Sequence, residues 1–514
     1  MSRVLNYFLK RKILTVFSGI IIFYLIYFGM IEGLSFKING DFYTILSTIS
    51  ACKNHLSGSF NANFFPDALL YSPHTNLLSW IIAFLSNIFS FEVFKAFYII
   101  APACLLLFIF SFDFFLIKLG MNSLKRALVI ITSFLLVPTV SNISYMGDSI
   151  FTLSDILVTT MGWRILGFAL FFICAGIFIE SEKKLSKKKI IALPILSFLL
   201  CNIYFVNFVI LLALIAVYLL YQKLSGRPNK NTLIALSLIV LGGLVNLLFW
   251  PFYNIISLSI ESYRNFQNSL MVKNPEDYDK NSLLYYLQTL SISLLALILL
   301  YKEKNDFIRV SATTCLLIVL FSLVIPYFNI PYFWRFAIFL KILLVVIFFR
   351  NFKFELKSLA TTATIALILS LFFISNTKML MAIRERQDNQ GKLYQSLKSL
   401  NLTEGLILSD ERTSNVIQAI DNYQVYNIPS GHVAGKEALK INNDRNKDLN
   451  NILRSHDYQK INDFLVKNDI FYIVLNQEAE FTETFKLLRN NDLSFYPKLS
   501  QEANLTVMKI ISLK

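Results

Sequence analysis

The 514-residue sequence has few charged residues, few cysteines and few histidines. Lys, Arg, Asp and Glu make up 16% of the chain, whereas apolar residues make up 55% and the mean hydropathy is +0.56. A water-soluble protein of this size does not bury so large an apolar share, so the composition indicates a membrane protein with many spans. The five cysteines form no CxxC pair and four lie inside apolar runs, which argues against a disulfide framework or a cysteine metal site.

The net charge of +15 is unevenly distributed. Residues 376–514 carry 18 Lys and Arg against 17 Asp and Glu, so almost all of the excess belongs to the apolar part of the chain. There the basic residues cluster between apolar runs, a pattern typical of membrane topology rather than of nucleic-acid binding. The clusters are Arg3/Lys10/Arg11/Lys12, Lys118/Lys125/Arg126, Lys183/Lys184/Lys187/Lys188/Lys189, Lys223/Arg227/Lys230, Lys302/Lys304/Arg309 and Arg350/Lys353/Lys357.

Placing every basic cluster on the cytoplasmic side predicts eleven spans, with the N-terminus inside and the C-terminus outside. The first span is too long for a signal peptide. The run 190–221 is too long for one span and must return to the same side, so we expect two short helices hinged near Asn202 to Asn207. The other expected spans are 13–30, 93–116, 127–145, 162–180, 232–252, 284–301, 310–328, 335–349 and 358–375. The extracytoplasmic segments are then 31–92, 146–161, 253–283, 329–334 and 376–514.

The first outer loop, residues 31–92, has an ordered set of features. Asp41 follows the first span, and the run from Phe42 to Leu56 has the apolar spacing of a one-sided helix that is too polar to cross a bilayer. A turn containing Pro73 and His74 precedes a second apolar run, Leu77 to Phe89, which is too short to span. We expect both runs to be helices lying in the membrane interface.

This order of an acid, an interfacial helix, a Pro-His turn and a second short helix resembles the first outer loop of type C (GT-C) membrane glycosyltransferases. The resemblance is strongest to the branch of protein O-mannosyltransferases and aminoarabinose transferases. In that branch a second acid often follows the Asp, and the turn reads His-Pro. Here Phe42 follows Asp41, and Pro73-His74 has the inverted order. The resemblance implies a GT-C-like helical domain over 1–377 in a bacterial cytoplasmic membrane, and inverting transfer of a sugar from a polyprenyl phosphate.

The resemblance assigns roles to four outer-loop residues, and each has an ordinary alternative. Asp41 would be the general base that takes the proton from an acceptor hydroxyl as its oxygen attacks the sugar C1, or it is a solvated acid at a span end. Asp148 and Asp155 would be metal ligands or positioning groups, or Asp155 is a helix N-cap. His74 would reach a phosphate or hydroxyl, or it is a surface residue beside a turn proline.

Basic residues are few in the predicted outer segments, where a lipid-linked phosphate needs cations. Arg335, Arg164 and Lys273 are therefore candidates for binding the donor phosphate. The alternative for each is an interfacial anchor, because arginine and lysine beside aromatic residues at span ends also serve that purpose. We assign Arg264 to this second group.

After Lys378 the sequence becomes richer in charge and mixes strand-like with helix-like runs. The strand-like runs are Leu406 to Leu408, Phe471 to Leu475 and Leu505 to Ile510. The helix-like runs are Ser414 to Asp421 and Asp448 to Asn468, with Ser409-Asp410 and Asn446 as expected N-caps. Residues 378–514 are therefore predicted to form a small extracytoplasmic α/β domain.

Three functions are compatible with the sequence. The first is a cell-envelope glycosyltransferase that uses a polyprenyl-phosphate sugar and a glycan, lipid or protein acceptor. It needs no cofactor, although a divalent metal is possible, and it binds no nucleic acid. The second is a transporter or flippase of lipid-linked glycans, which would place polar residues deep within spans. The third is a non-catalytic GT-C-like protein, with which the absence of a second acid beside Asp41 agrees.

Overall fold

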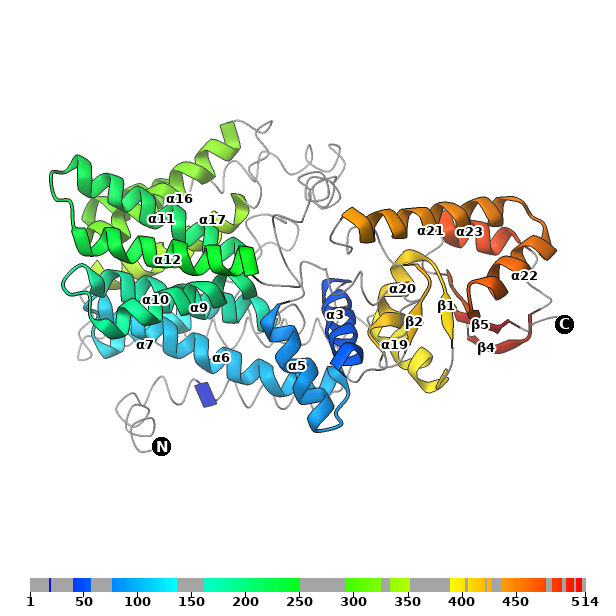
Figure 1. Cartoon of the computed structure of the whole chain (residues 1–514). Helices are drawn as coiled ribbons and strands as arrows, with labels where there is room; N and C mark the ends of the chain where they lie inside the picture. The colour runs from blue at the N-terminus through cyan, green and yellow to red at the C-terminus, as the bar shows by residue number, and fades with distance from the viewer. Residues whose placement is uncertain are drawn as a thin grey trace. The chain divides into compact units, whose positions relative to one another are not determined.

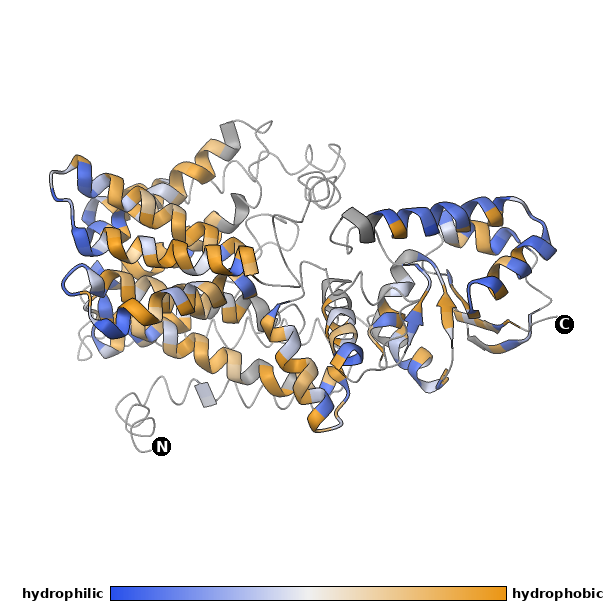
Figure 2. Cartoon of the chain, in the orientation of Figure 1, coloured by the Kyte–Doolittle hydropathy of each residue, from blue (hydrophilic) through white to orange (hydrophobic). Residues whose placement is uncertain are grey.

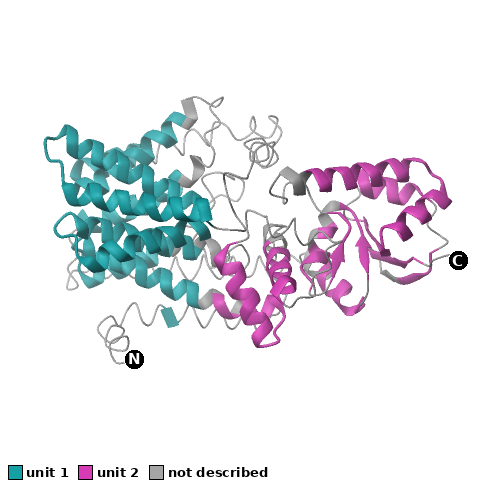
Figure 3. Cartoon of the chain, in the orientation of Figure 1, with its two compact units in different colours: residues 1–33, 101–249, 272–385 teal, residues 34–100, 250–271, 386–514 magenta. Residues whose placement is uncertain are grey.

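A computed structural model describes residues 18–19, 40–56, 76–135, 161–249, 293–324, 333–351, 389–402, 405–420, 423–427, 436–477, 483–491, 496–502 and 505–510. The chain forms two compact units (Figure 3). Unit 1 consists of residues 1–33, 101–249 and 272–385, and unit 2 consists of residues 34–100, 250–271 and 386–514.

Unit 1 is built from apolar helices (Figures 1 and 2). Each predicted span from 93–116 to 335–349 contains a helix where it falls on described residues. The span 358–375, and the span 13–30 apart from residues 18–19, lie outside the described residues. A helical segment also covers Ser293–Lys302. The labelled helices are α6 (Val93–Lys118, of which residues 93–100 are counted with unit 2), α7 (Ser123–Leu135), α9 (Met161–Ser181), α10 (Lys187–Ile203), α11 (Phe205–Leu224), α12 (Lys230–Phe249), α16 (Asp306–Val324) and α17 (Phe333–Asn351).

Phenylalanine side chains fill the core between α6, α9 and α17. On α6, Phe108, Phe112 and Phe115 are spaced three and four residues apart, so they share one helix face, and all are fully buried. The Phe112 ring stacks on Phe172 of α9 with the ring centroids 4.3 Å apart. Phe168 of α9 contacts Phe339 of α17 at 5.0 Å. Such pairs contribute about 0.5–1.5 kcal/mol each beyond the apolar area that they bury.

The expected hinge in the run 190–221 is confirmed. Helix α10 ends at Ile203, Tyr204 adopts a non-helical conformation (φ −151°, ψ 82°), and α11 begins at Phe205. The two helices pack together and both pack on α12. Close approach to α12 depends on Gly242, where an added Cβ would lie 2.1 Å from the carbonyl oxygen of Pro194.

The loops that carry basic clusters meet at one end of the bundle, which we call the polar end (residues 118–126, 180–189, 218–232, 303–309 and 350–351). Lys118 pairs with Glu180 at 2.9 Å, and Gln222 donates to Glu182 at 2.9 Å. Arg309 donates to the hydroxyl of Tyr221 at 2.9 Å.

Buried acids complete the polar end. The Glu303 side chain is fully buried and pairs with Arg350 at 3.2 Å, and Arg350 also donates to the carbonyl of Leu119 at 2.9 Å. Asp113 is buried and pairs with Arg126 at 2.7 Å. Figure 2 shows hydrophilic residues gathered at this end and hydrophobic residues along the helices. The basic loops therefore share one end of unit 1, as the alternation of spans predicts.

Two helices among the described residues, α11 and α12, are long and apolar enough to cross a membrane by length and composition. The outer face of α12 leaves large apolar side chains exposed, including Leu241, Leu248 and Phe249. Apolar surface of this kind is normally covered by lipid or by a partner protein. The full count of eleven spans stays a prediction.

Unit 2 begins with the predicted outer-loop helices. Helix α3 covers Gly40–Leu56 and α5 covers Leu77–Ile88, so both runs are helical as expected, and their position in the membrane interface stays a prediction. Asn76 caps α5, because its side chain accepts a hydrogen bond from the backbone N–H of Ser79 at 3.1 Å. α5 has 12 residues, about 18 Å of helix, which is too short to cross a bilayer.

The rest of unit 2 contains a five-stranded sheet of order β2-β1-β3-β5-β4 (Figure 1). β1, β2 and β3 are parallel, and β5 and β4 continue the sheet in antiparallel pairing. The strands are β1 (Leu406–Leu408), β2 (Gln424–Val425), β3 (Ile470–Asn476), β4 (Lys498–Glu502) and β5 (Leu505–Lys509). The helices are α19 (Asn389–Ser399), α20 (Glu411–Gln418), α21 (Lys436–Arg454), α22 (Tyr458–Lys467) and α23 (Glu483–Asn490).

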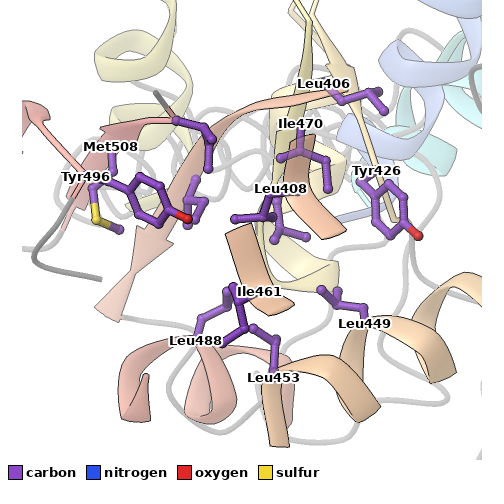
Figure 4. Close-up of a cluster of buried hydrophobic side chains, with 13 residues drawn as sticks. Leu406, Leu408, Tyr426, Leu449, Leu453, Ile461, Ile470, Leu488, Tyr496 and Met508 are labelled. Atoms are coloured by element: carbon purple, nitrogen blue, oxygen red, sulfur yellow. The ribbon is translucent and has the colours of Figure 1, made fainter. Parts of the chain in front are cut away.

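An apolar cluster joins this sheet to α21, α22 and α23 (Figure 4). Leu408 of β1 and Ile470 of β3 lie in the cluster with Leu449, Leu453 and Ile461 of the helices. The three predicted strand runs fall on β1, β3 and β5, which confirms them. The apolar runs predicted these strands correctly because the strands have buried, apolar residues on the face toward the helices.

Two local predictions in this region are wrong and one is confirmed. The run 448–468 is not one helix: α21 ends at Arg454, His456 has a positive φ of 51°, and Asp457 caps α22. Asn446 lies inside α21 and is not an N-cap. Asp410 does cap α20, because it accepts a hydrogen bond from the Thr413 N–H at 2.9 Å.

Candidate functional site

Asp41 lies in the first turn of α3. Further along this helix, residues 45–52 are all buried, so this stretch of α3 is covered on every face. α3 packs against α5 of the same outer loop and against α20 of the sheet region. The segment that carries Asp41 is therefore supported by elements far apart in the sequence.

An ion pair and a ring contact tie the outer loop to α19 within unit 2. Lys398 donates to Glu92 at 2.6 Å, and Phe94 contacts the ring of Tyr394 at 6.4 Å. Burial raises the pKa of Glu92, but the hydrogen bond and charge of Lys398, helped by Lys95, outweigh burial and hold that pKa below its usual value. Glu92 is therefore ionised at neutral pH and the pair is charged.

Arg164 and Arg335 occupy equivalent places on two helices of unit 1. Arg164 is the fourth residue of α9 and Arg335 is the third residue of α17. Four residues after each arginine stands a phenylalanine, and these two rings, Phe168 and Phe339, are in contact at 5.0 Å.

The two helices are parallel. At their other ends, Glu180 of α9 pairs with Lys118, and Arg350 of α17 bonds to Leu119. Both therefore end at the polar end of the bundle and begin at the opposite end. The backbones at Arg164 and Arg335 lie about 6 Å, one helical turn, beyond the ring contact. Unit 1 thus brings these two predicted phosphate-binding residues to the same end of adjacent helices.

Both arginines lie in the first described turn of their helices. An arginine side chain can form charge-assisted hydrogen bonds with a phosphate, so the shared end of α9 and α17 is the region where the predicted phosphate site would lie.

Four predicted site residues lie outside the described residues: His74, Asp148, Asp155 and Lys273. Arg264, assigned to anchoring, does so too. Their assignments stay predictions. Within the described ranges, no three His, Cys, Asp or Glu side chains gather as metal ligands would.

Sequence reasoning placed a hinge near Asn202 to Asn207 but gave its asparagines no role. Asn202 and Asn246 are buried, and the Asn202 amide donates to the Asn246 carbonyl oxygen at 2.9 Å. Asn207 is fully buried in the first turn of α11. Asparagines within two largely apolar runs, 190–221 and 232–252, were the signal that could have found this cluster.

No model of a known protein family matches the sequence, and no curated protein matches it either. Solved structures of the oligosaccharyltransferase of the archaeon Archaeoglobus fulgidus are similar in fold. The apo form matches with a TM-score of 0.52 and 11% identity, over 96% of this chain and 73% of the other. A complex with zinc and sulfate matches with a TM-score of 0.50 and 12% identity, over 92% and 69%. A form tethered to an acceptor peptide with the NVT sequon matches with a TM-score of 0.50 and 12% identity, over 94% and 72%.

This likeness is one of fold. At 11–12% identity, the comparison concerns the fold and assigns no activity, substrate or partner to this chain. The GT-C superfamily, its O-mannosyltransferase and aminoarabinose transferase branch, and a bacterial origin stay predictions.

Proposed function

We propose that this chain is a membrane glycosyltransferase that transfers a sugar from a polyprenyl-phosphate donor to an extracytoplasmic acceptor. The observation that carries the proposal is the pair Arg164 and Arg335 at the beginnings of the contacting parallel helices α9 and α17. The phosphate of a lipid-linked donor needs a cationic binding site at the membrane surface, because the lipid tail stays in the bilayer. The GT-C fold agrees with this chemistry, and Lys273 is a third candidate for the phosphate.

In the proposed reaction Asp41 is the general base. The acceptor hydroxyl oxygen attacks C1 of the sugar, and its proton passes to the Asp41 carboxylate. The new C1–O bond forms as the bond from C1 to the donor phosphate oxygen breaks, with inversion at C1. The polyprenyl phosphate leaves with the electron pair, and the two arginines stabilise the charge that develops on it.

His74, Asp148 and Asp155 have secondary roles in this proposal. His74 contacts a phosphate or acceptor hydroxyl, and Asp148 and Asp155 position the acceptor. These two carboxylates are also the residues that would hold a divalent cation, since hard cations prefer carboxylate oxygens. A zinc and sulfate complex is known for the archaeal structure, and the step assigned to Asp41 does not depend on a metal here.

The proposed setting is a bacterial cytoplasmic membrane crossed eleven times, with the polar end of the bundle in the cytoplasm. Basic loops gather at that end, as the positive-inside rule requires. Asp41 and the domain at 378–514 are then extracytoplasmic. The acceptor is a glycan, lipid or protein of the cell envelope. The archaeal structure tethered to an acceptor peptide supports a protein acceptor.

Transport is the weaker alternative. A flippase would use buried charges along a path through the bundle. The buried acids Asp113 and Glu303 are instead ion-paired at the polar end, where they hold loops together. A non-catalytic GT-C-like protein is a further alternative, and the following experiment separates it from an enzyme.

Purified full-length protein in liposomes is given synthetic polyprenyl-phosphate sugars and envelope acceptors, and release of polyprenyl phosphate is measured. We expect D41N to lower the transfer rate by about 10²–10⁴-fold while donor binding is kept. R164A and R335A should each weaken donor binding about tenfold, the loss of one charged contact. Asp67→Asn and Arg264→Ala are matched controls from the predicted outer loops. Donor binding without turnover in the wild type would favour the non-catalytic reading, and unchanged transfer in D41N would remove Asp41 from the mechanism.

A further inference from the structure

The hinge between α10 and α11 holds a buried polar layer in apolar surroundings. Asn202 is the last residue but one of α10, Asn246 lies near the end of α12, and Asn207 lies in the first turn of α11. Their exposures are 5%, 0% and 0%. Burying three amides costs free energy that only hydrogen bonds can recover.

One hydrogen bond joins two of the three amides, whereas the third amide has no partner among the described residues. Asn202 donates to Asn246 at 2.9 Å, and Asn246 in turn donates to the sulfur of Cys201 at 3.4 Å. Both the Oδ1 and the Nδ2 of Asn207 lack a hydrogen-bond partner among the residues that the structure describes. A leucine of similar volume would avoid this cost, so packing gives no reason for an amide at position 207.

Asn207 lies at the same end of the bundle as the two arginines. The hinge residue Tyr204 packs against α9 at Gly167, where an added Cβ would lie 2.5 Å from the Cβ of Tyr204. Gly167 is three residues, less than one turn, from Arg164. Asn207 is in turn three residues from Tyr204, and its backbone N–H donates to the Tyr204 carbonyl at 3.1 Å.

We propose that Asn207 is a sugar-binding residue that recognises hydroxyl groups of the lipid-linked donor. An amide has an oxygen that accepts hydrogen bonds and a nitrogen that donates them. One hydroxyl of a sugar can donate to the amide oxygen while a neighbouring hydroxyl accepts from the amide nitrogen. A phosphate would pair only with the nitrogen and would leave the carbonyl oxygen unsatisfied. The proposal rests on the proposed function, because both concern the same donor molecule. The arginines bind its phosphate and Asn207 binds its sugar.

The test compares binding of two kinds of probe to the full-length protein in nanodiscs. One is a short-chain polyprenyl phosphate without sugar, and the other is the same lipid with a hexosyl, N-acetylhexosaminyl or pentosyl group. The variants are Asn207→Leu, which matches the volume, and Asn207→Ala, which adds no bulk. Asn446→Leu is the matched control, because both amide atoms of Asn446 in α21 are likewise buried without a hydrogen-bond partner in the described part of the chain.

We expect both variants at position 207 to bind the sugar-free lipid as the wild type does. They should bind the preferred sugar lipid about tenfold more weakly, the loss of a hydrogen bond of about 1.4 kcal/mol. Asn207→Leu should melt at the same temperature as the wild type or higher, because the empty protein loses an unsatisfied amide. Asn446→Leu should leave both affinities unchanged.

Other outcomes separate the two proposals. If the wild type binds both lipids but the variants at position 207 bind them equally well, Asn207 holds only an internal water and the sugar-site proposal fails alone. If no sugar lipid binds the wild type more tightly than the sugar-free lipid, the sugar-site proposal also fails. If the wild type binds neither lipid, the proposed function fails and takes this inference with it.

Discussion

At the scale of single residues, the buried charges of unit 1 have structural partners. Glu303 accepts from Arg350 at 3.2 Å, from the Asn305 N–H at 2.6 Å and from the Asn351 amide at 3.1 Å. Removing one partner of such a buried pair leaves an uncompensated charge, which costs about 3–5 kcal/mol. The sequence shows the basic clusters, but it does not show which acid each base meets, because the partners belong to different loops.

The pair of Glu92 and Lys398 predicts a pH dependence in unit 2. The pKa of Glu92 is lowered from its usual 4.5, so its contribution to stability is fully present above that pH and is lost as the pH falls through the folded pKa. Because the side chains are 35% and 41% exposed, we expect at most about 1 kcal/mol.

Chemical denaturation of the wild type and Glu92→Gln between pH 7 and pH 3 measures this contribution. The difference in unfolding free energy between the two should be constant above about pH 5 and should disappear toward pH 3. Glu483→Gln, which breaks the more exposed pair with Arg454, is the control. A difference that grows as the pH falls would contradict the assignment.

At the scale of elements, helix length and hydropathy predicted more than local signals did. The run 190–221 had to be broken because its length exceeds one span and its flanking basic clusters must share a side, and Tyr204 is the break. The break at 455–457 was missed because no glycine or proline marks it. His456 takes the positive φ instead. The amide contact between Asn202 and Asn246 was also missed, since it joins positions 44 residues apart.

The contact between α10 and α12 gives the prediction at this scale. An added Cβ at Gly242 would lie 2.1 Å from both the Pro194 carbonyl oxygen and the Ser197 hydroxyl oxygen. The Pro194 oxygen belongs to the backbone, so a side-chain rotation cannot relieve this contact. We expect Gly242→Ala to destabilise the bundle by about 1–3 kcal/mol, as overpacking usually does.

Thermal unfolding of detergent-solubilised protein would show this as a lower melting temperature than that of the wild type. Leu241→Ala, at a neighbouring position where the side chain is exposed, should change the melting temperature little. Equal effects of the two substitutions would mean that the close approach of α10 and α12 is not required.

At the scale of the whole molecule, the sequence predicted a membrane part and a separate tail, divided near residue 378. In the structure the outer-loop helices α3 and α5 belong to the same compact unit as the sheet of the tail. Contacts such as Lys398 to Glu92 join residues 306 positions apart, which no local pattern reveals. The positions of Arg164 and Arg335 at span ends could be predicted from the sequence. That α9 and α17 are neighbours could not, because it depends on the packing of Phe168 against Phe339.

Photo-labelling tests the central claim, that a lipid-linked phosphate binds where α9 and α17 begin, most directly. A polyprenyl phosphate with a photoreactive group beside its phosphate would be irradiated with the full-length protein in nanodiscs, and labelled peptides would be identified by mass spectrometry. We predict labels in the first turns of α9 and α17, at 161–165 and 333–337, and their loss when unlabelled polyprenyl phosphate is in excess. Competed labels confined to the polar end of the bundle, or to the sheet of unit 2, would contradict the account.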